Sequence, residues 1–595
     1  MNNKEIKKIK EQIDRLPKGS ISVKKINGKE YEYWQFTENG KQISRRVKGA
    51  ELLILQNQIE ERRRLEALLM KDPGPESEKT LGEVPAVPPL NTSVRTGDEL
   101  LRFAGAVRNL KKRECYRQLE DYIYGPTNDR VFILYGLRRT GKTTLIRQVI
   151  WNMPPDILGE TAFIQISPKN TLSDVNKDLR ILESFGYKYV FIDEATLMED
   201  FIEGAALFSD VYASSEMKIV LSGTDSLGFI FSESEELYDR CVLLHTTFIP
   251  YREFAEVLGI KGIDEYIRYG GTMSLGGVNY NLKRMPFATE SSTNEYIDSA
   301  IARNIQHSLK NYQYGGHFRH LITLYEKDEL TGAINRVVED INHRFTLEVL
   351  TGRFKSHDLG ISKTNLRKDR EKPTSILDEI SIDDVTNRLK QILEIREKEE
   401  QTAAISDVHA SEIEEYLKLL DLIEYIDEAS ARDSAKYRRT VFTQPGLRYS
   451  QAEALIVSLM EDQTFRSVGI KERSRITQRI LDEIRGRMME DIILLETKQA
   501  MPGKQVFPLR FAVGEFDMVI FDPEQISCEI YEIKHSDKTA AEQYRHLIDK
   551  TKCKETEKQY GEITRRCVLY RGPRTDFNGI EYLNVEEYLS ELGTV

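Results

Sequence analysis

A glycine-rich loop near residue 140 is the clearest place in the sequence where chemistry could occur. Residues 136–143 have the pattern G-x-x-x-x-G-K-T, directly after the apolar run 131–135 and before a helical pattern. Backbone N–H groups of such a loop surround a triphosphate, and the positive end of the helix dipole adds to the attraction. Lys142 would reach the β- and γ-phosphates of ATP, and the Thr143 hydroxyl would ligate Mg²⁺. The candidate nucleotide-binding residues are Gly136, Arg139, Thr140, Gly141, Lys142, Thr143, Thr144 and Thr224.

Two acids at the end of another apolar strand extend the prediction from nucleotide binding to hydrolysis. Asp193 and Glu194 follow the apolar residues 189–192. Asp193 could bind Mg²⁺ through water, and Glu194 could orient and deprotonate the attacking water. The run 161–167 predicts a strand between the loop and the acids, which is the order expected when an extra strand separates the two motifs.

Two further positions could respond to the γ-phosphate. Ser222 and Thr224 end the strand that begins near Met217, where a hydroxyl could act as a sensor. Arg240, just before the predicted strand 241–245, is a candidate arginine finger that would act in cis or from a neighbouring subunit. The alternative for Arg240 is a surface ion pair with a nearby acid. A finger acting in trans would require a homo-oligomer.

A second group of charged residues lies near the C-terminus, on two predicted strands joined by a turn. Asp517 is on the first strand, while Glu532 and Lys534 share one face of the second, because side chains two apart on a strand point the same way. The carboxylates could hold Mg²⁺, and Lys534 could position or activate a water that attacks a phosphodiester. Glu490, on an upstream helix, could complete the metal shell. The alternative is that these are ordinary surface residues of a strand pair.

The length of the chain and the order of its patterns predict several domains. At roughly 150 residues per domain, 595 residues correspond to about four domains. A helix with a capping box at Ser411 and Glu414, followed by a hairpin, suggests a winged helix. The predicted segments are a small basic β-sheet plus helix (1–70), a proline-rich linker (71–98), a P-loop ATPase core (99–250), a helical lid (251–345), a winged-helix-like domain (346–450) and a nuclease-like domain (451–595).

Composition and charge restrict the possible partners. The 85 Lys and Arg against 96 Asp and Glu give a net charge of −11, which argues against a protein that coats nucleic acid or binds membrane surfaces. Residues 1–70 hold 16 basic and 10 acidic residues, so their net charge is +6 and the rest of the chain carries −17. DNA contacts would come from such local patches, or from the basic wing residues Arg432, Lys436, Arg438 and Arg439. Five scattered cysteines and no bilayer-length apolar run predict a cytoplasmic protein with no membrane partner.

The order of these motifs resembles a large prokaryotic family of AAA-type ATPases, in which a winged helix and a restriction-endonuclease-like, PD-(D/E)xK domain follow the ATPase. The resemblance covers about residues 100–595. It implies a multidomain α/β fold with an AAA/ASCE-type core and a helical lid. It also implies roles for these residues: Lys142 and Thr143 for nucleotide and Mg²⁺, Asp193 and Glu194 for metal and water, Thr224 or Ser222 as sensor, Arg240 as finger, and Glu490, Asp517, Glu532 and Lys534 as the nuclease-like set. The sequence has Ser-Gly-Thr at 222–224 where the family more usually has Thr-Gly-Ser.

Two functions are compatible with these patterns. The first is an ATP-hydrolysing enzyme whose ATPase cycle controls a Mg²⁺-dependent DNA endonuclease in the same chain. The second is a nucleotide-dependent switch or scaffold whose nuclease-like fold only binds DNA or a protein partner.

Overall fold

The computed structural model describes most of the chain beyond residue 87 and part of the N-terminal region. The described residues are 16–17, 20–26, 29–38, 41–47, 52, 55, 58–59, 62, 88–126, 129–198, 200–224, 228–230, 237, 239–259, 261–272, 290–311, 318–355, 405–431, 437–461, 466 and 469–593. The predicted linker up to residue 87 and the wing residues Arg432 and Lys436 lie outside this set. The chain divides into two compact units, Met1–Gly82 and Glu83–Val595.

The N-terminal unit contains a small antiparallel sheet, as predicted from its alternating strands and turns. Strands β1 (Ser20–Ile26), β2 (Lys29–Glu38) and β3 (Lys41–Arg46) pair in chain order. Leu55 and Ile59, four residues apart on a helical segment, form a small apolar cluster with Val47, and Trp34 packs against it.

The second unit contains a six-stranded sheet whose order is β4-β6-β7-β8-β5-β9. All its neighbouring strands are parallel except β4 and β6. Strand β8 lies between β5, which precedes the glycine-rich loop, and β7, which ends at the two acids. The run 161–167 forms β6 on the far side of β7, so the predicted separating strand is β8 instead. The bounds are β4 Ser93–Arg95, β5 Val131–Tyr135, β6 Thr161–Gln165, β7 Tyr189–Asp193, β8 Lys218–Gly223 and β9 Cys241–His245.

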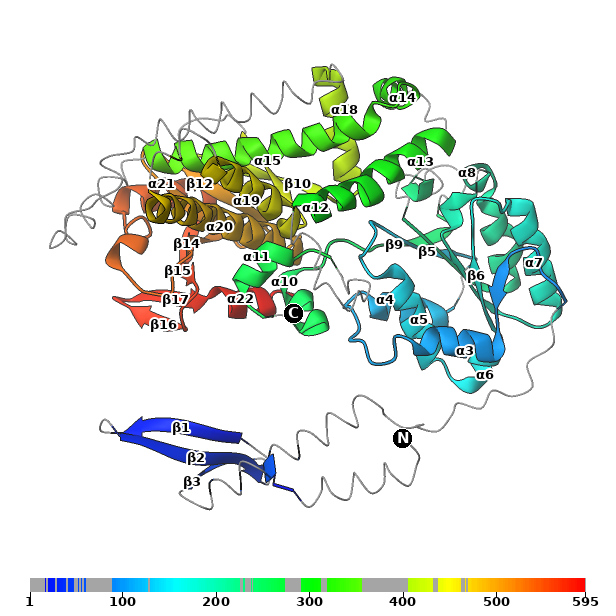
Figure 1. Cartoon of the computed structure of the whole chain (residues 1–595), viewed down its shortest axis with the longest axis horizontal. Helices are drawn as coiled ribbons and strands as arrows, with labels where there is room; N and C mark the ends of the chain where they lie inside the picture. Colours follow the sequence, from blue (N-terminus) through cyan, green and yellow to red (C-terminus); the bar gives the residue numbers. More distant parts are fainter. Residues whose placement is uncertain are drawn as a thin grey trace. The chain divides into compact units, whose positions relative to one another are not determined.

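Helices cover both faces of this sheet (Figure 1). On one face, Tyr122 of α4 and Phe103 of α3 contact Phe132 and Phe163 at ring-centroid distances of 5.2 and 4.5 Å. Side chains that alternate to the other face pack with Leu179 and other apolar residues of α7. The helices are α3 (Gly97–Gly105), α4 (Tyr116–Tyr124), α5 (Lys142–Asn152), α6 (Pro155–Gly159), α7 (Leu172–Ser184) and α8 (Phe201–Gly204).

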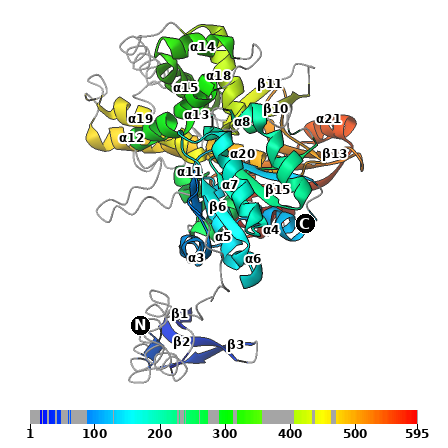
Figure 2. The same ribbon diagram turned by 90° about the vertical axis from the view of Figure 1, so that its right-hand side faces the viewer.

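A helical region follows, and its helix α18 begins earlier than predicted. The cap of α18 is Ser406, which forms a capping box with His409, so Ser411 lies inside the helix rather than at its start. Helix α12 lies beside α19 (Figure 2), where the Thr293 and Ser450 hydroxyls are 2.6 Å apart. The helices are α10 (Tyr251–Leu258), α11 (Ile263–Tyr269), α12 (Glu290–Tyr296), a π-helical turn (Ile297–Ala302), α13 (Arg303–Asn311), α14 (Arg319–Glu326), α15 (Leu330–Lys355), α18 (Asp407–Leu419) and α19 (Pro445–Glu461).

The predicted wing hairpin belongs to the C-terminal sheet. Eight strands have the order β11-β10-β12-β13-β14-β15-β17-β16, and β10 pairs in parallel with β12 through Ala429 and Leu509. The predicted boundary at 450/451 falls within α19, so the structure does not divide the modules there. The strands are β10 (Ile423–Ser430), β11 (Tyr437–Phe442), β12 (Gln505–Arg510), β13 (Glu515–Asp522), β14 (Ser527–Lys534), β15 (Glu562–Tyr570), β16 (Thr575–Phe577) and β17 (Ile580–Asn584).

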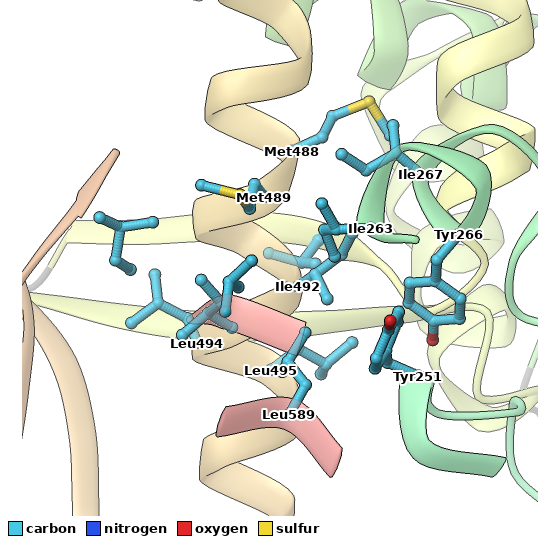
Figure 3. Close-up of a cluster of buried hydrophobic side chains, with 14 of the residues drawn as sticks. Tyr251, Ile263, Tyr266, Ile267, Met488, Met489, Ile492, Leu494, Leu495 and Leu589 are labelled. Carbon is cyan, nitrogen blue, oxygen red and sulfur yellow. The ribbon is translucent and has the colours of Figure 1, made fainter. Parts of the chain in front are cut away.

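The long helix α20 (Ile470–Ala500) is at the centre of the largest apolar core (Figure 3). Its Met488 and Ile492 face Ile263 and Ile267 of α11, and its Leu495 lies near Leu589 of α22 (Val585–Glu591). Helices α10 and α11 therefore share a core with the C-terminal sheet, although the sequence places them in the lid. Helix α21 (Lys550–Tyr560) contributes to a separate core on the other face of the sheet. No helix in the described part of the chain is long and apolar enough to cross a bilayer.

Candidate functional site

The glycine-rich loop joins β5 to α5 and requires glycine at both ends. Gly136 has φ +141°, and a Cβ atom there would lie 2.4 Å from the Thr246 carbonyl oxygen. Gly141 has φ +93° just before α5. These conformations are strained for other residues, so both glycines are needed to bring the loop backbone around a phosphate.

Lys142 is buried beneath this loop. Its Nζ donates to the carbonyl oxygens of Gly136 and Leu137, both at 2.8 Å. Burial lowers the pKa of Lys142 to about 8, although Glu194 and Asp193 act in the opposite direction. Phosphate oxygens are charged acceptors, so they would bind this ammonium more strongly than the loop carbonyls do.

The end of β7 provides the acids that a nucleotide-bound Mg²⁺ requires. The Thr143 hydroxyl donates to Asp193 Oδ2 at 3.1 Å, and Ser222 donates to the other oxygen of the same carboxylate. A hydroxyl beside a buried carboxylate fits the oxygen-rich shell that Mg²⁺ prefers. The structure thus brings together the predicted pair Thr143 and Asp193, and it places Ser222 on Asp193.

Glu194 is the first residue after β7 and has a left-handed backbone conformation with φ +59°. The backbone N–H and the hydroxyl of Thr224 both donate to its Oε2 at 3.3 Å. Burial and the neighbouring Asp193 raise the pKa of Glu194, which makes its carboxylate a stronger base toward water. The predicted sensor positions therefore contact one acid each: Ser222 contacts Asp193, and Thr224 contacts Glu194.

Two residues that the sequence analysis missed hold this site in place. Arg113 donates to the loop carbonyl of Thr140 at 2.8 Å and forms a buried ion pair with Glu253. Asn304, on α13, donates to the Thr224 carbonyl oxygen at 2.6 Å. Arg113 lies within a run of charged residues that looked like an ordinary surface, and Asn304 lies in a helical pattern without a motif.

The other predicted loop contacts are mostly internal. The Thr140 hydroxyl donates to the Leu137 carbonyl oxygen and lies 2.8 Å from the Thr246 hydroxyl. The Arg139 guanidinium lies 5.4 Å from the ring centre of Tyr296. Thr144 is the third residue of α5. Thr140 therefore stabilises the loop conformation.

The position of Arg240 contradicts a finger role in cis. Arg240 precedes β9, and β9 runs parallel to β5 with Cys241 opposite Val131. The glycine-rich loop follows Tyr135, so Arg240 lies at the opposite edge of the sheet, about 15 Å away along the strands. Its guanidinium pairs with Asp210 at 3.0 Å, and both side chains are about half exposed. This is the surface ion pair of the alternative prediction, and a role in trans stays a prediction.

The basic wing is also different from the prediction. Arg439 is buried and pairs with Glu428 and Asp491. Arg438 pairs with Asp427 at 3.1 Å. Because acids neutralise both arginines, they are poor candidates for contacts to a DNA backbone.

The C-terminal carboxylates and lysine meet as predicted. Strands β13 and β14 are antiparallel with Met518 opposite Tyr531, which brings Asp517 beside Glu532. Lys534 Nζ lies 2.8 Å from Asp517 Oδ2 and 2.6 Å from Glu532 Oε2. The backbone N–H of Ile533 also donates to Asp517 Oδ2 at 2.7 Å.

Burial makes this cluster electrostatically unusual. Burial and the neighbouring Asp517 raise the pKa of Glu532 well above its usual range. Burial alone would lower the pKa of Lys534, but the two carboxylates raise it. The second oxygen of Glu532, Oε1, is buried without a hydrogen-bond partner. A buried, unpaired carboxylate oxygen fits a cation ligand better than it fits a purely structural ion pair.

Glu490, the third predicted metal ligand, pairs with an arginine in this structure, and its metal role stays a prediction. It accepts a hydrogen bond from Arg487 at 2.7 Å. Among the described residues, no three or more His, Cys, Asp or Glu are arranged to hold a metal ion. The site that the structure assembles is therefore Asp517, Glu532 and Lys534.

Comparison with known proteins gives two family matches. Residues 128–255 match a family described as an AAA domain, and residues 3–65 match a domain of unknown function (DUF6788). No curated protein matches the chain.

Two solved structures can also be compared with the chain. The Hsp104:casein complex of S. cerevisiae, in its extended conformation, has 16% identity over 27% of this chain and 31% of that chain, with a TM-score of 0.23. The ORC1 protein of Aeropyrum pernix in complex with DNA has 13% identity over 62% of this chain and 98% of that chain, with a TM-score of 0.22. Because these TM-scores are low, the family match and the loop geometry carry the conclusion. Residues 128–255 thus match an AAA domain and carry a phosphate-binding loop, within a multidomain α/β chain.

Proposed function

We propose that ATP hydrolysis at the glycine-rich loop controls a metal-dependent DNA-cleaving site formed by Asp517, Glu532 and Lys534. The observation that carries the proposal is the pair of buried carboxylates held together by one lysine, with one carboxylate oxygen left without a partner. Two such carboxylates are suited to a hard divalent cation, and the lysine is suited to a water or a phosphate oxygen.

At the nucleotide site, each side chain has a separate task. Lys142 and the loop N–H groups hold the phosphates, and Thr143 and Asp193 would hold Mg²⁺, which lowers the charge on the phosphates. Glu194 accepts a proton from the attacking water, and its raised pKa favours that transfer. Thr224 orients Glu194 through two hydrogen bonds.

At the C-terminal site, Asp517 and Glu532 would hold Mg²⁺, which supplies charge stabilisation at the phosphodiester. The Lys534 ammonium, which contacts both carboxylates, would position a water or a phosphate oxygen. Ile533 keeps Asp517 in position through its backbone N–H.

The route that we propose for control is a series of polar contacts made by α10 and α11. Glu253, the partner of Arg113, lies on α10, and the N–H of Tyr251 on the same helix donates to Glu496 of α20 at 2.8 Å. Asp264, on α11, lies 2.8 Å from His535 Nε2 and 2.6 Å from Arg571. His535 directly follows Lys534, so a shift of α10 and α11 would reach the carboxylate cluster.

A second candidate function is a nucleotide-dependent switch without cleavage. The contact of Lys534 with both carboxylates favours it, since such a closed cluster can be purely structural. In that case the C-terminal sheet binds DNA or a protein partner only.

The substitution Glu194→Gln tests hydrolysis. It removes the base and keeps the loop, so ATP hydrolysis should fall at least about 100-fold while nucleotide binding stays near that of the wild type. Turnover and fluorescent-nucleotide binding measure the two effects. Glu183→Gln, an exposed position on α7, is the matched control. Equal turnover in the two variants would contradict the role of Glu194.

The lowered pKa of Lys142 predicts a pH dependence of nucleotide binding. The ammonium is present below pH 8 and is lost above it, so affinity for ADP without Mg²⁺ should fall by up to about tenfold between pH 7 and pH 9. In Lys142→Arg, whose guanidinium stays charged, the affinity should change much less. Parallel pH profiles of the two proteins would show that Lys142 does not cause the effect.

The substitution Asp517→Asn tests the nuclease. In the full chain it should abolish Mn²⁺ binding in the absence of nucleotide, measured by calorimetry, and DNA nicking, while ATP hydrolysis continues. Asp522→Asn, on the same strand and partly exposed, is the control and should retain both activities. If the wild type with Mg²⁺ or Mn²⁺ and ATP leaves every form of DNA intact, the switch is the better assignment.

The substitution Asp264→Asn tests control. It removes the charge that holds His535 and Arg571, so the ratio of DNA cleavage with ATP to cleavage without ATP should move toward one, at unchanged ATP hydrolysis. Asp427→Asn breaks an exposed ion pair with Arg438 and should keep the wild-type ratio. An unchanged ratio in Asp264→Asn would remove this contact from the route.

A further inference from the structure

Three basic side chains form a cluster near the carboxylates, on the face of the sheet covered by α21. Arg545 Nε lies 3.2 Å from His546 Nε2, and Lys552 Nζ lies 2.5 Å from His546 Nδ1. Helix α21, which carries Lys552, contacts β14, the strand that carries Glu532 and Lys534. The cluster is therefore next to the candidate cleavage site.

The contacts within the cluster contain more donors than acceptors. Burial lowers the pKa of His546 to about 4, so its imidazole is neutral and can accept a hydrogen bond at one ring nitrogen only. Arg545 and the Lys552 ammonium are both donors, and each faces a different ring nitrogen. Burial lowers the pKa of Lys552 as well. When Lys552 is charged, one ring N–H of His546 faces a cation in either tautomer, so an anion at the cluster would favour the charged lysine.

Lys552 is the most unusual member of the cluster. It is only 7% exposed, and in the described part of the chain the hydrogen-bond partner of its Nζ is His546 and not an acid. The nearest acid in sequence, Asp549, accepts hydrogen bonds from the backbone N–H groups of Thr551 and Lys552 at the start of α21. Gly514 lies against the cluster, since a Cβ atom there would come within 2.9 Å of Lys552 Nζ. A buried ammonium without a carboxylate partner is costly unless a ligand binds it.

The surrounding segment is basic although the chain is acidic. Residues 533–554 contain six Lys and Arg against three Asp and Glu, so their net charge is +3. Two large apolar side chains close in sequence to Gly514 and His546, Val513 and Ile548, are 64% and 55% exposed. Basic groups with apolar neighbours suit a sugar-phosphate chain better than they suit a small free anion.

We propose that Arg545, His546 and Lys552 bind a backbone phosphate of DNA adjacent to the phosphodiester that lies at Asp517 and Glu532. The proposal rests on the proposed DNA-directed function for the identity of the ligand, but it does not require cleavage. The cluster supplies the positive charge that the carboxylates lack, and it fixes the register of the strand relative to them.

Binding of a labelled DNA duplex to the full chain in EDTA, followed by fluorescence anisotropy, tests this site without metal or cleavage. The pair Arg545→Gln and Lys552→Met should weaken binding at least about tenfold and reduce the slope of log affinity against log salt by about one for each lost contact. The pair Lys554→Gln and Lys558→Met makes the same charge change at exposed positions of α21 and should alter affinity less than threefold. Equal weakening by the two pairs would overturn the site.

Two further measurements keep the test decisive. Substitution of Lys552 could unfold the domain, so Arg545→Gln alone, at a half-buried position, is the second variant and should also weaken binding. An unchanged affinity in a folded Arg545→Gln protein would overturn the proposal. Inorganic phosphate that displaces the duplex at micromolar concentration would identify a free-anion site instead of a DNA site. If the wild type binds the duplex as expected and no protein cuts DNA, the binding site stands and the nuclease fails.

Discussion

The buried ion pair between Arg113 and Glu253 is the contact on which the arrangement of the second unit depends. The Arg113 guanidinium also donates to carbonyl oxygens of the phosphate loop and of the segment that follows β9. Removing one partner of such a pair typically costs about 3 to 5 kcal/mol, because the other charge stays buried. One arginine thus holds together the nucleotide loop, the end of the central sheet and the start of α10, and α10 packs on α20.

The same physical constraint recurs in the C-terminal module. Asp491 of α20 pairs with Arg439 of β11 and Arg448 of α19, and Glu428 of β10 pairs with Arg439 and Arg510. These charges lie between elements that the sequence assigns to different modules. Buried charges need partners at fixed positions, so this network sets how the hairpin, α19, α20 and the sheet fit together. The carboxylates on β13 and β14 are supported by this rigid frame.

Local patterns were enough to predict which residues lie together at the glycine-rich loop and on β13 and β14, but not the long-range arrangement. The loop from Gly136 to Thr143 and the two acids after β7 were predicted because each depends on neighbours in sequence. The position of β8 between β5 and β7, and the pairing of β10 with β12, depend on contacts between distant segments. Arg113 looked like one of several surface charges, because burial and ion pairing are not visible in a single sequence.

The pairing of β10 with β12 also has a consequence for how the chain folds. About 80 residues separate Ala429 from its partner Leu509, and two helices lie between them. A contact of such long range forms slowly, because the loop must close before any pairing enthalpy is gained. Until the hairpin docks, β12 has an unpaired edge that other chains could join. A fragment that begins after the hairpin would keep this edge permanently, so a fragment of the C-terminal module that covers this edge must include the hairpin, which begins at Ile423.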